Sequence, residues 1–167
     1  MKSGLSVRSD NYADVLDALS KLSGTDVLVG IPADKAQRED GSPINNAELG
    51  YLHSTGATVQ IDGETVTLPP RPFLYMGIED SREKTTERLK LAAQAALEGD
   101  TSLAEQHLEA AGQIAQMAAQ AVIGSGDRLT PLSEITKAKR LANGQDIKPL
   151  YDHGYLMRSI TYVVRKK

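Results

Sequence analysis

The 167-residue sequence contains no cysteine and no tryptophan, and it has a single phenylalanine. Without cysteine there is no disulfide framework and no thiolate chemistry, so a reducing cytoplasm suits the chain. The scarcity of aromatic residues argues against a base-stacking platform for single-stranded nucleic acid. No stretch approaches the roughly 18 consecutive apolar residues of a membrane span, and the first residues lack the apolar segment of a secretory signal. We therefore expect a soluble chain with no membrane partner.

The motifs of catalysis and cofactor binding are also missing. There is no HExxH, no loop of alternating carboxylates that leads to a terminal Glu, and no phosphate-binding GxxxxGK[ST]. The three histidines, His53, His107 and His153, form no convincing catalytic group. A small hydrolase that uses His153, beside Asp152, or His53 stays as a distant alternative. We expect no enzyme activity, no cofactor and no bound metal.

The net charge of −3 conceals an uneven distribution. Residues 1–127 hold 10 basic and 19 acidic residues, a net charge of −9, whereas residues 128–167 hold 9 basic and 3 acidic residues, a net charge of +6. Such a split can steer identical subunits head to tail, or it can present a basic surface to DNA. Charged surfaces are also often uneven without any role.

Hydrophobic periodicity predicts the first elements of the fold. Apolar residues spaced by three and four predict an amphipathic helix over 11–22, and the β-branched run at 26–31 predicts a strand buried on both faces. The polar segment 33–46 predicts a flexible loop. A short helix is expected over 46–54, with Ala47, Leu49, Leu52 and Tyr51 as candidates for the inward face.

The clearest local signal is a β-hairpin arm at 57–68. Two alternating runs flank Asp62-Gly63, a dipeptide that supplies the positive φ of a two-residue turn. This turn fixes the register, with Val59 opposite Val66 and Ile61 opposite Glu64. Because a hairpin alone is only marginally stable, we expect its apolar face to pack on another element.

Two long alanine-rich helices follow. The first is expected over 72–98 and the second from a capping box formed by Ser102 and Glu105. A shorter helix, capped by Thr130-Pro131, should run to about Leu141, and a strand is expected over 160–165. For the first long helix, the inward candidates are Phe73, Met76, Leu89, Ala92, Ala93, Ala96 and Leu97. The sequence therefore predicts one α+β domain over 1–167, a small mixed or antiparallel sheet with a β-hairpin packed against two long alanine-rich helices.

Two stretches carry a recognisable pattern. VLVGIP, NNAELGYLHSTGATV and LPPRPFLYMGI lie between residues 27 and 78, and PLYDHGYLMRSITYVV occupies 149–164. In order and spacing they resemble the motifs of tailed-phage tail-completion and head-tail joining proteins of the virion-morphogenesis type, although His153 stands where that family has threonine. The matching positions are Ala47, Glu48, Gly56, Pro70, Arg71, Pro72, Phe73, Leu74, Asp152, Gly154, Leu156, Ser159 and Ile160.

The resemblance implies a structural subunit at the phage neck, assembled in the bacterial host cytoplasm and retained in the virion. Its expected partners are further copies of itself in a ring, as a hexamer or dodecamer, the head connector or adaptor proteins, and the tail terminator or tail tube protein. Genomic DNA would only pass through, held by non-specific attraction. A tail terminator or minor tail protein is the alternative within the same class, and a nucleic-acid-binding module is an alternative from another class.

Several residues have more than one possible role. Arg71, between prolines, can hold a carboxylate or carbonyl either within the subunit, as a lock on the fold, or across an interface. The loop 33–46 and the hairpin 57–68 are candidate arms that settle on neighbours. Four basic residues near the chain end are candidates for a DNA channel or an interface, namely Arg158, Arg165, Lys166 and Lys167.

Overall fold

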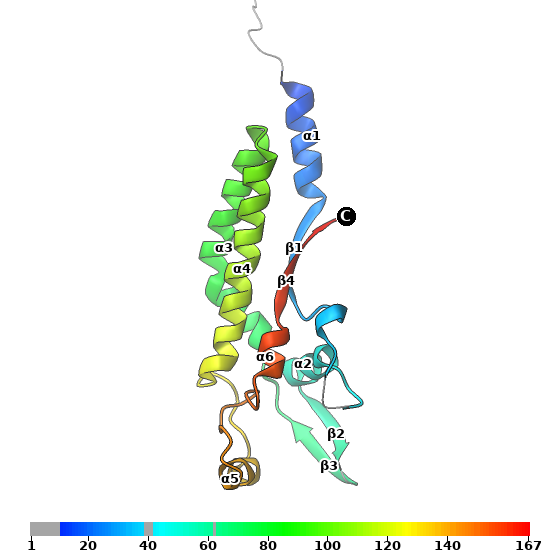
Figure 1. Ribbon diagram of the computed structural model, residues 1–167, viewed down its shortest axis with the longest axis vertical. Helices are drawn as coiled ribbons and strands as arrows, with labels where there is room; N and C mark the ends of the chain where they lie inside the picture. The colour runs from blue at the N-terminus through cyan, green and yellow to red at the C-terminus, as the bar shows by residue number, and fades with distance from the viewer. Residues whose placement is uncertain (1–10, 39–41, 62) are drawn as a thin grey trace, which may run out of the picture.

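Two long helices run side by side along most of the molecule's length (Figure 1). They are α3, Phe73–Leu97, and α4, Thr101–Ser125. This computed structural model describes residues 11–38, 42–61 and 63–167. The two helices approach closely because small residues face each other: a Cβ added at Gly77 would overlap the backbone N and Cα of Ala119. A packing surface is therefore formed by the buried small residues of α4, which are Ala104, Ala111, Gly112, Ala115 and Ala119.

The turn between α3 and α4 lies where the sequence predicts a break. Gly99 has φ of +84°, a conformation that favours glycine. The expected capping box is wrong, however, because the N-cap of α4 is Asp100, which lies two residues before Ser102 and accepts a hydrogen bond from the amide of Leu103 at 2.9 Å. Ser102 and Glu105 thus lie inside the helix. An aspartate at this position satisfies an amide that has no partner in the first turn.

A two-stranded antiparallel sheet lies along α4 (Figure 1). Helix α1, Tyr12–Ser23, leads into strand β1, Thr25–Gly30, which pairs with the last strand, β4, Thr161–Lys166. The predicted burial of the first strand on both faces is wrong. Leu28 and Val163 lie opposite each other in the register and are each 42% exposed. With a single partner strand and helices on one face, the other face of this sheet stays open to solvent.

The hairpin forms in the predicted register. Strands β2, Ala57–Ile61, and β3, Glu64–Leu68, pair with Val59 opposite Val66 and Ile61 opposite Glu64. Gly63 has φ of +81°, while Asp62 of the same turn lies outside the described residues. The hairpin is a sheet of its own and projects beyond the long helices next to α2 (Figure 1). The α+β class is confirmed, and its strands form two separate antiparallel pairs.

The polar segment 33–46 begins with a single 3₁₀ turn, η1, Ala33–Lys35, and leads into α2, Asn46–Thr55. Residues 39–41 of this predicted flexible loop lie outside the described residues. The ends of the segment are held together, because the amide of Asn46 donates to the carbonyl oxygen of Ala36 at 2.7 Å and Ala36 is buried. On α2 Tyr51 is 69% exposed, so its predicted inward position is wrong.

Helix α5 spans Glu134–Ala142 and is capped by Ser133, whose hydroxyl oxygen accepts a hydrogen bond from the amide of Thr136. The predicted cap at Thr130-Pro131 is therefore wrong. A short helix, α6, Tyr155–Ser159, follows Gly154, which has φ of +74°. It leads directly into β4.

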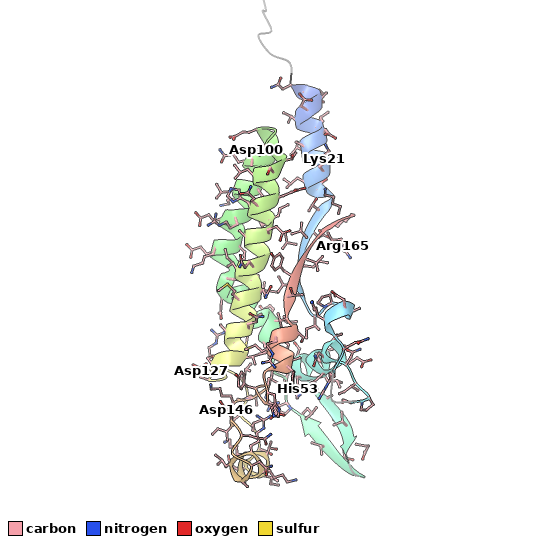
Figure 2. The ribbon with its side chains drawn as sticks, viewed as in Figure 1. Lys21, His53, Asp100, Asp127, Asp146 and Arg165 are labelled. Carbon is pink, nitrogen blue, oxygen red and sulfur yellow. The ribbon has the colours of Figure 1, made fainter. Side chains whose placement is uncertain are left out.

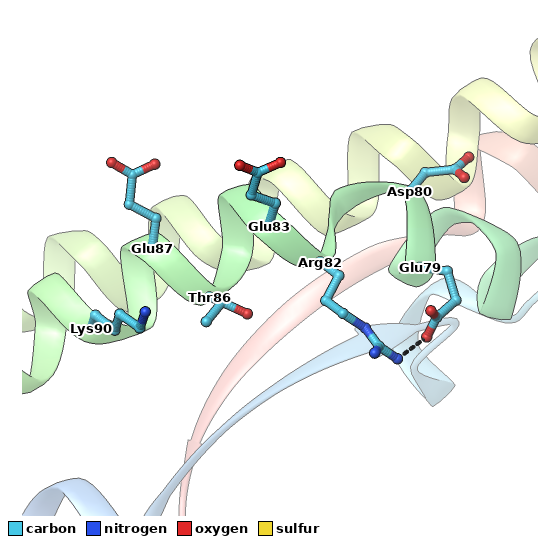
Figure 3. A pocket seen from close by; sticks show the side chains of 7 residues that line it. All are labelled: Glu79, Asp80, Arg82, Glu83, Thr86, Glu87 and Lys90. Atoms are coloured by element: carbon cyan, nitrogen blue, oxygen red, sulfur yellow. Dashed lines mark hydrogen bonds and ion pairs between the residues drawn. The ribbon is translucent and has the colours of Figure 1, made fainter.

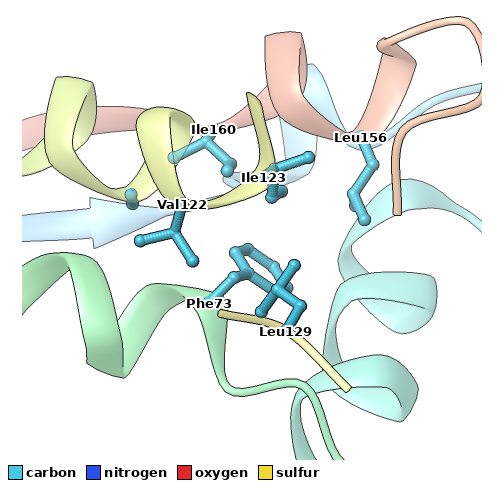
Figure 4. Packing of buried hydrophobic residues seen from close by; sticks show 7 residues of the cluster. Phe73, Val122, Ile123, Leu129, Leu156 and Ile160 are labelled. Carbon is cyan, nitrogen blue, oxygen red and sulfur yellow. The ribbon is translucent and has the colours of Figure 1, made fainter. Parts of the chain in front are cut away.

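The largest buried cluster lies where α3, α4 and α6 meet. Seven buried residues form it, and Figure 4 labels six of them. They are Phe73, Ala119, Val122, Ile123, Leu129, Leu156 and Ile160. Two of the predicted inward positions on α3 are wrong, because Leu89 is 43% exposed and Leu97 is 45% exposed. They lie toward the far end of α3, where the buried residues are the alanines at 92, 95 and 96.

Candidate functional site

The two motif stretches, far apart in the sequence, meet in the main core. Phe73 from the first stretch packs in one cluster with Leu156 and Ile160 from the second (Figure 4). Helix α2 joins them through Gly50, because a Cβ added there would lie 3.6 Å from both the Phe73 ring and Leu156. The motif residues Phe73, Leu156 and Ile160 thus form a shared scaffold.

Arg71 ties this scaffold to the segment before α5. The side chain is 4% exposed, and its Nε donates to the carbonyl oxygen of Thr130 at 2.6 Å while Nη2 donates to that of Pro131 at 3.0 Å. Its backbone amide donates to the carbonyl oxygen of His53 at 2.7 Å, and the Thr130 hydroxyl donates to that of Pro70 at 3.1 Å. Of the two roles open to Arg71, the structure shows the lock within the subunit.

Burial and the nearby charge of Arg140 lower the pKa of Arg71. Arginine stays protonated under such a shift because its ordinary pKa is so high. Arg140 has a similar task, since its Nη1 donates to the carbonyl oxygens of Asp146, Lys148 and Tyr151. Two arginines therefore organise the irregular chain between α4 and α6 by binding backbone carbonyls.

The remaining residues of the first motif stretch shape its turns. Glu48 completes a capping box on α2, accepting from the Asn45 amide at 2.9 Å while Asn45 accepts from the Glu48 amide. Gly56 has φ of +76°, and a Cβ there would lie 3.0 Å from the carbonyl oxygen of Leu68. Pro70 and Pro72 flank Arg71, and Pro72 is the N-cap of α3.

The second stretch is held by short-range contacts. Asp152 accepts from Gln145 Nε2 at 3.0 Å, and Ser159 donates its hydroxyl to the carbonyl oxygen of Leu156 at 2.7 Å. Gly154 occupies the left-handed region before α6. Most of the motif positions therefore have a structural role in the described part of the chain.

The four basic candidates do not form one patch. Arg165 and Lys167 both pair with Asp26, at 3.4 and 2.9 Å, and Lys166 pairs with Glu105 at 3.6 Å. The contacts of Lys167 and Arg165 with Asp26 lower the pKa of the Asp26 carboxyl group. Arg158 lies on α6, which precedes β4, whereas Arg165 lies near the far end of that strand, and the Arg158 guanidinium covers the Tyr155 ring at 5.0 Å.

The histidines of the hydrolase alternative have different surroundings. His153 is exposed and pairs through Nδ1 with Asp152 at 3.2 Å. His53 lies toward the hairpin end of the molecule (Figure 2), and burial, together with Arg71, lowers its pKa. Its Nδ1 is buried without a hydrogen-bond partner. Among the described residues neither ring forms a hydrogen bond with a serine hydroxyl, and no group of His, Asp and Glu there could hold a metal ion.

One face of α3 is strongly charged. Glu79, Asp80, Glu83, Glu87 and two cations line a shallow hollow, where Glu83 and Glu87 project away from the helix (Figure 3). Arg82 pairs with Glu79, and Asp80 is bound by Arg128 at 3.0 Å. Glu83 and Glu87 form no ion pair among the residues that the structure describes.

A second hollow was not anticipated from the sequence. Its lining residues come from two parts of the chain: Lys35, Gln37, Arg38 and Asn46 at or before the start of α2, and Tyr155, Arg158 and Ser159 of α6. The charge of Arg158 marks it as a candidate in the sequence. Its neighbours in the hollow, Lys35, Arg38 and Asn46, come from a separate part of the chain. No local pattern marks such a site, because only the folding of α2 against α6 creates it.

Comparison with known proteins gives no relative: the chain matches no protein-family model, no curated protein and no solved structure. Among its described helices, none combines the length and apolar character needed to cross a lipid bilayer.

Proposed function

We propose that the chain is a structural subunit of a tailed-phage particle, a tail-completion or head-tail joining protein that forms a ring between the head connector and the tail tube. The observation that carries this proposal is the convergence of the two motif stretches on one core. Phe73, Leu156 and Ile160 come from stretches about 80 residues apart, yet they pack together. Because residues from both motif stretches pack against each other, we favour a true family resemblance over a chance match of the two motifs.

The roles of the motif residues also suit a structural protein. The Arg71 side chain binds the carbonyl oxygens of Thr130 and Pro131, and the Ser159 hydroxyl donates to the carbonyl oxygen of Leu156 within α6. Catalysis would instead need a nucleophile or a proton carrier held within hydrogen-bond reach of a second reacting group.

The surface offers places for contact with other subunits. The hairpin projects at one end of the molecule (Figure 1), and its strands have free edges to which another chain can add. The open face of the β1–β4 sheet presents Leu28 and Val163. Within the proposed ring these would meet neighbouring copies, the head connector or the tail tube. Genomic DNA would pass without sequence-specific contact.

The test is an in vitro joining assay. Heads that carry their connector and separate tails are purified from a phage whose copy of this gene is deleted, and the purified protein is then added. The proposal predicts that the protein restores joined, infectious particles, counted by electron microscopy and plaque titre. Failure to bind either particle part, while the added protein is folded, would contradict it. Binding to tails alone, at their end, would favour the tail terminator alternative.

A separate arm tests the hydrolase alternative. The protein variants His53→Gln and His153→Gln are added to the same joining assay. The structural proposal predicts that both restore joining as the unchanged protein does, provided that they fold. Loss of joining in a folded His153→Gln variant, accompanied by substrate turnover in the unchanged protein alone, would favour the enzyme.

A further inference from the structure

The groove that lies between α6 and the described residues Lys35, Arg38 and Asn46 contains three cationic side chains. Lys35, Arg38 and Arg158 line it, together with Asn46 and Tyr155, and its volume is about 610 Å³. Neither Lys35 nor Arg158 forms an ion pair with any carboxylate that the structure describes. Arg158 is held in place by the Tyr155 ring beneath its guanidinium. Two cations without partner carboxylates therefore face one groove.

Asn46 adds a hydrogen-bonding group to the groove. It is 5% exposed and lines the groove, yet its side-chain amide makes no hydrogen bond within the described part of the chain. Its amide atoms stay open to the groove, because among the described residues only Nδ1 of His53 is both buried and without a hydrogen-bond partner. The amide can therefore bond a polar group that enters the groove. Asn46 is also the first residue of α2, where the helix dipole favours negative charge. The groove is thus suited to a negatively charged hydrogen-bond acceptor.

The shape of the groove selects the kind of anion. A carboxylate on a slender side chain can reach a recessed amide such as that of Asn46, whereas a DNA duplex is a stiff rod whose phosphates stay at its surface. The chain itself carries suitable groups, because Glu83 and Glu87 project from the outer face of α3 (Figure 3). They are four residues apart and so lie on the same side of the helix.

From this complementarity we propose that the groove of one subunit receives Glu83 and Glu87 of a second copy of the chain. The contact rests on the ring subunit proposed above and specifies where neighbouring subunits meet. In Figure 1 α3 forms one side of the molecule, and η1 and α2 form the other. Two different surfaces on opposite sides make a head-to-tail contact, which generates a closed ring or an open filament.

The test is the mass of the purified protein by light scattering over a range of concentrations, at low and at high ionic strength. The groove variant is Lys35→Ala with Arg158→Ala, and the face variant is Glu83→Gln with Glu87→Gln. Lys84→Ala with Arg88→Ala removes two charges elsewhere on α3 and serves as the control. Asn46→Asp is a further groove variant, which places a repelling charge at the site while suiting the start of a helix.

The unchanged protein and the control are expected to self-associate, more strongly at low ionic strength. The groove variant, the face variant and Asn46→Asp should associate at least about tenfold more weakly while keeping the unchanged protein's circular dichroism spectrum. An equal mixture of the groove and face variants should stop at dimers, because only one intact contact can form between them. Dimers of this kind are not expected from an interface that uses the same surface on both subunits.

Three results would overturn this contact: an unchanged protein that is monomeric at every concentration, folded groove and face variants that associate normally, or a groove variant that loses only affinity for double-stranded DNA. The joining assay separates this outcome from the proposed function. Particles joined by a monomeric protein would refute the contact alone, whereas association without joining would refute the neck function alone.

Discussion

The guanidinium of Arg71 and the carbonyl oxygen of Thr130, 59 residues apart in the chain, are joined by a hydrogen bond of 2.6 Å. This bond and the one to Pro131 connect the start of α3 to the segment beyond the end of α4. The two bonds hold these segments together at the end of the α3–α4 pair where the main core lies. Several consequences of this packing can be measured.

Replacing Arg71 by Ala should lower the free energy of unfolding by roughly 2–4 kcal/mol, because two buried carbonyl oxygens lose a charged donor. Arg71→Lys should recover only part of this loss, since an ammonium group lacks the planar fork. Chemical denaturation gives both values. The control, Arg82→Ala, removes an exposed ion pair and should change stability by less than about 1 kcal/mol. Equal losses in Arg71→Ala and the control would refute the lock.

Replacing Gly77 by Ala should force α3 and α4 apart, because the added Cβ would overlap the backbone of Ala119. We expect a loss of about 2–3 kcal/mol in the free energy of unfolding, since backbone cannot move aside as a side chain can. Gly124→Ala is the matched control, as its nearest neighbour would be Met157 Sδ at 3.8 Å. That change should be neutral or stabilise by up to about 1 kcal/mol. The helix packing would be contradicted by a neutral Gly77→Ala.

Replacing Gly63 by Val should weaken the hairpin, because a β-branched residue resists its φ of +81°. No atom lies within 4 Å of the added Cβ, so backbone strain alone should cost about 1–2 kcal/mol. Faster amide hydrogen exchange in β2 and β3 would report it. Gly30→Val, without a positive φ, should leave this exchange unchanged. Unaltered exchange in Gly63→Val would show that the turn does not depend on glycine.

His53 should make stability depend on pH below about its ordinary pKa of 6.5. Burial and Arg71 lower the pKa of His53 in the folded state, so between the lowered value and 6.5 the unfolded chain binds more protons. Stability should therefore be complete above pH 6.5, fall as the pH drops through this window, and level off below the folded pKa. His53→Gln should lose this part of the dependence, whereas His107→Gln should keep it. Identical pH profiles for the two variants would contradict the assignment.

Local signals in the sequence predict much of the fold. The hairpin register follows from the two-residue turn, because this loop length leaves one antiparallel alignment. The start of α3 follows from the prolines around Arg71, and its end follows from Gly99. The cap of α4 was missed because Asp100 and Ser102 are both good capping residues, and the side chain that meets the first free amide depends on the packed turn.

Long-range relationships could not be predicted in the same way. The pairing of β1 with β4 joins strands from the two ends of the chain, and its open face with Leu28 and Val163 depends on what lies beside the sheet. The partners of Arg71 are backbone carbonyls, which leave no signature in the sequence. The groove at Asn46 arises only when α2 and α6 meet. For the same reason, the sequence could not show that Arg158 lies apart from Arg165, Lys166 and Lys167.

The most direct test of the neck assignment is the position of the protein in the mature particle. If the proposed function holds, a gold-labelled or tagged copy, imaged by electron microscopy in purified phage particles, is predicted to lie at the junction of head and tail, in a ring of several copies. Its absence from purified particles, or a position elsewhere on them, would contradict the assignment.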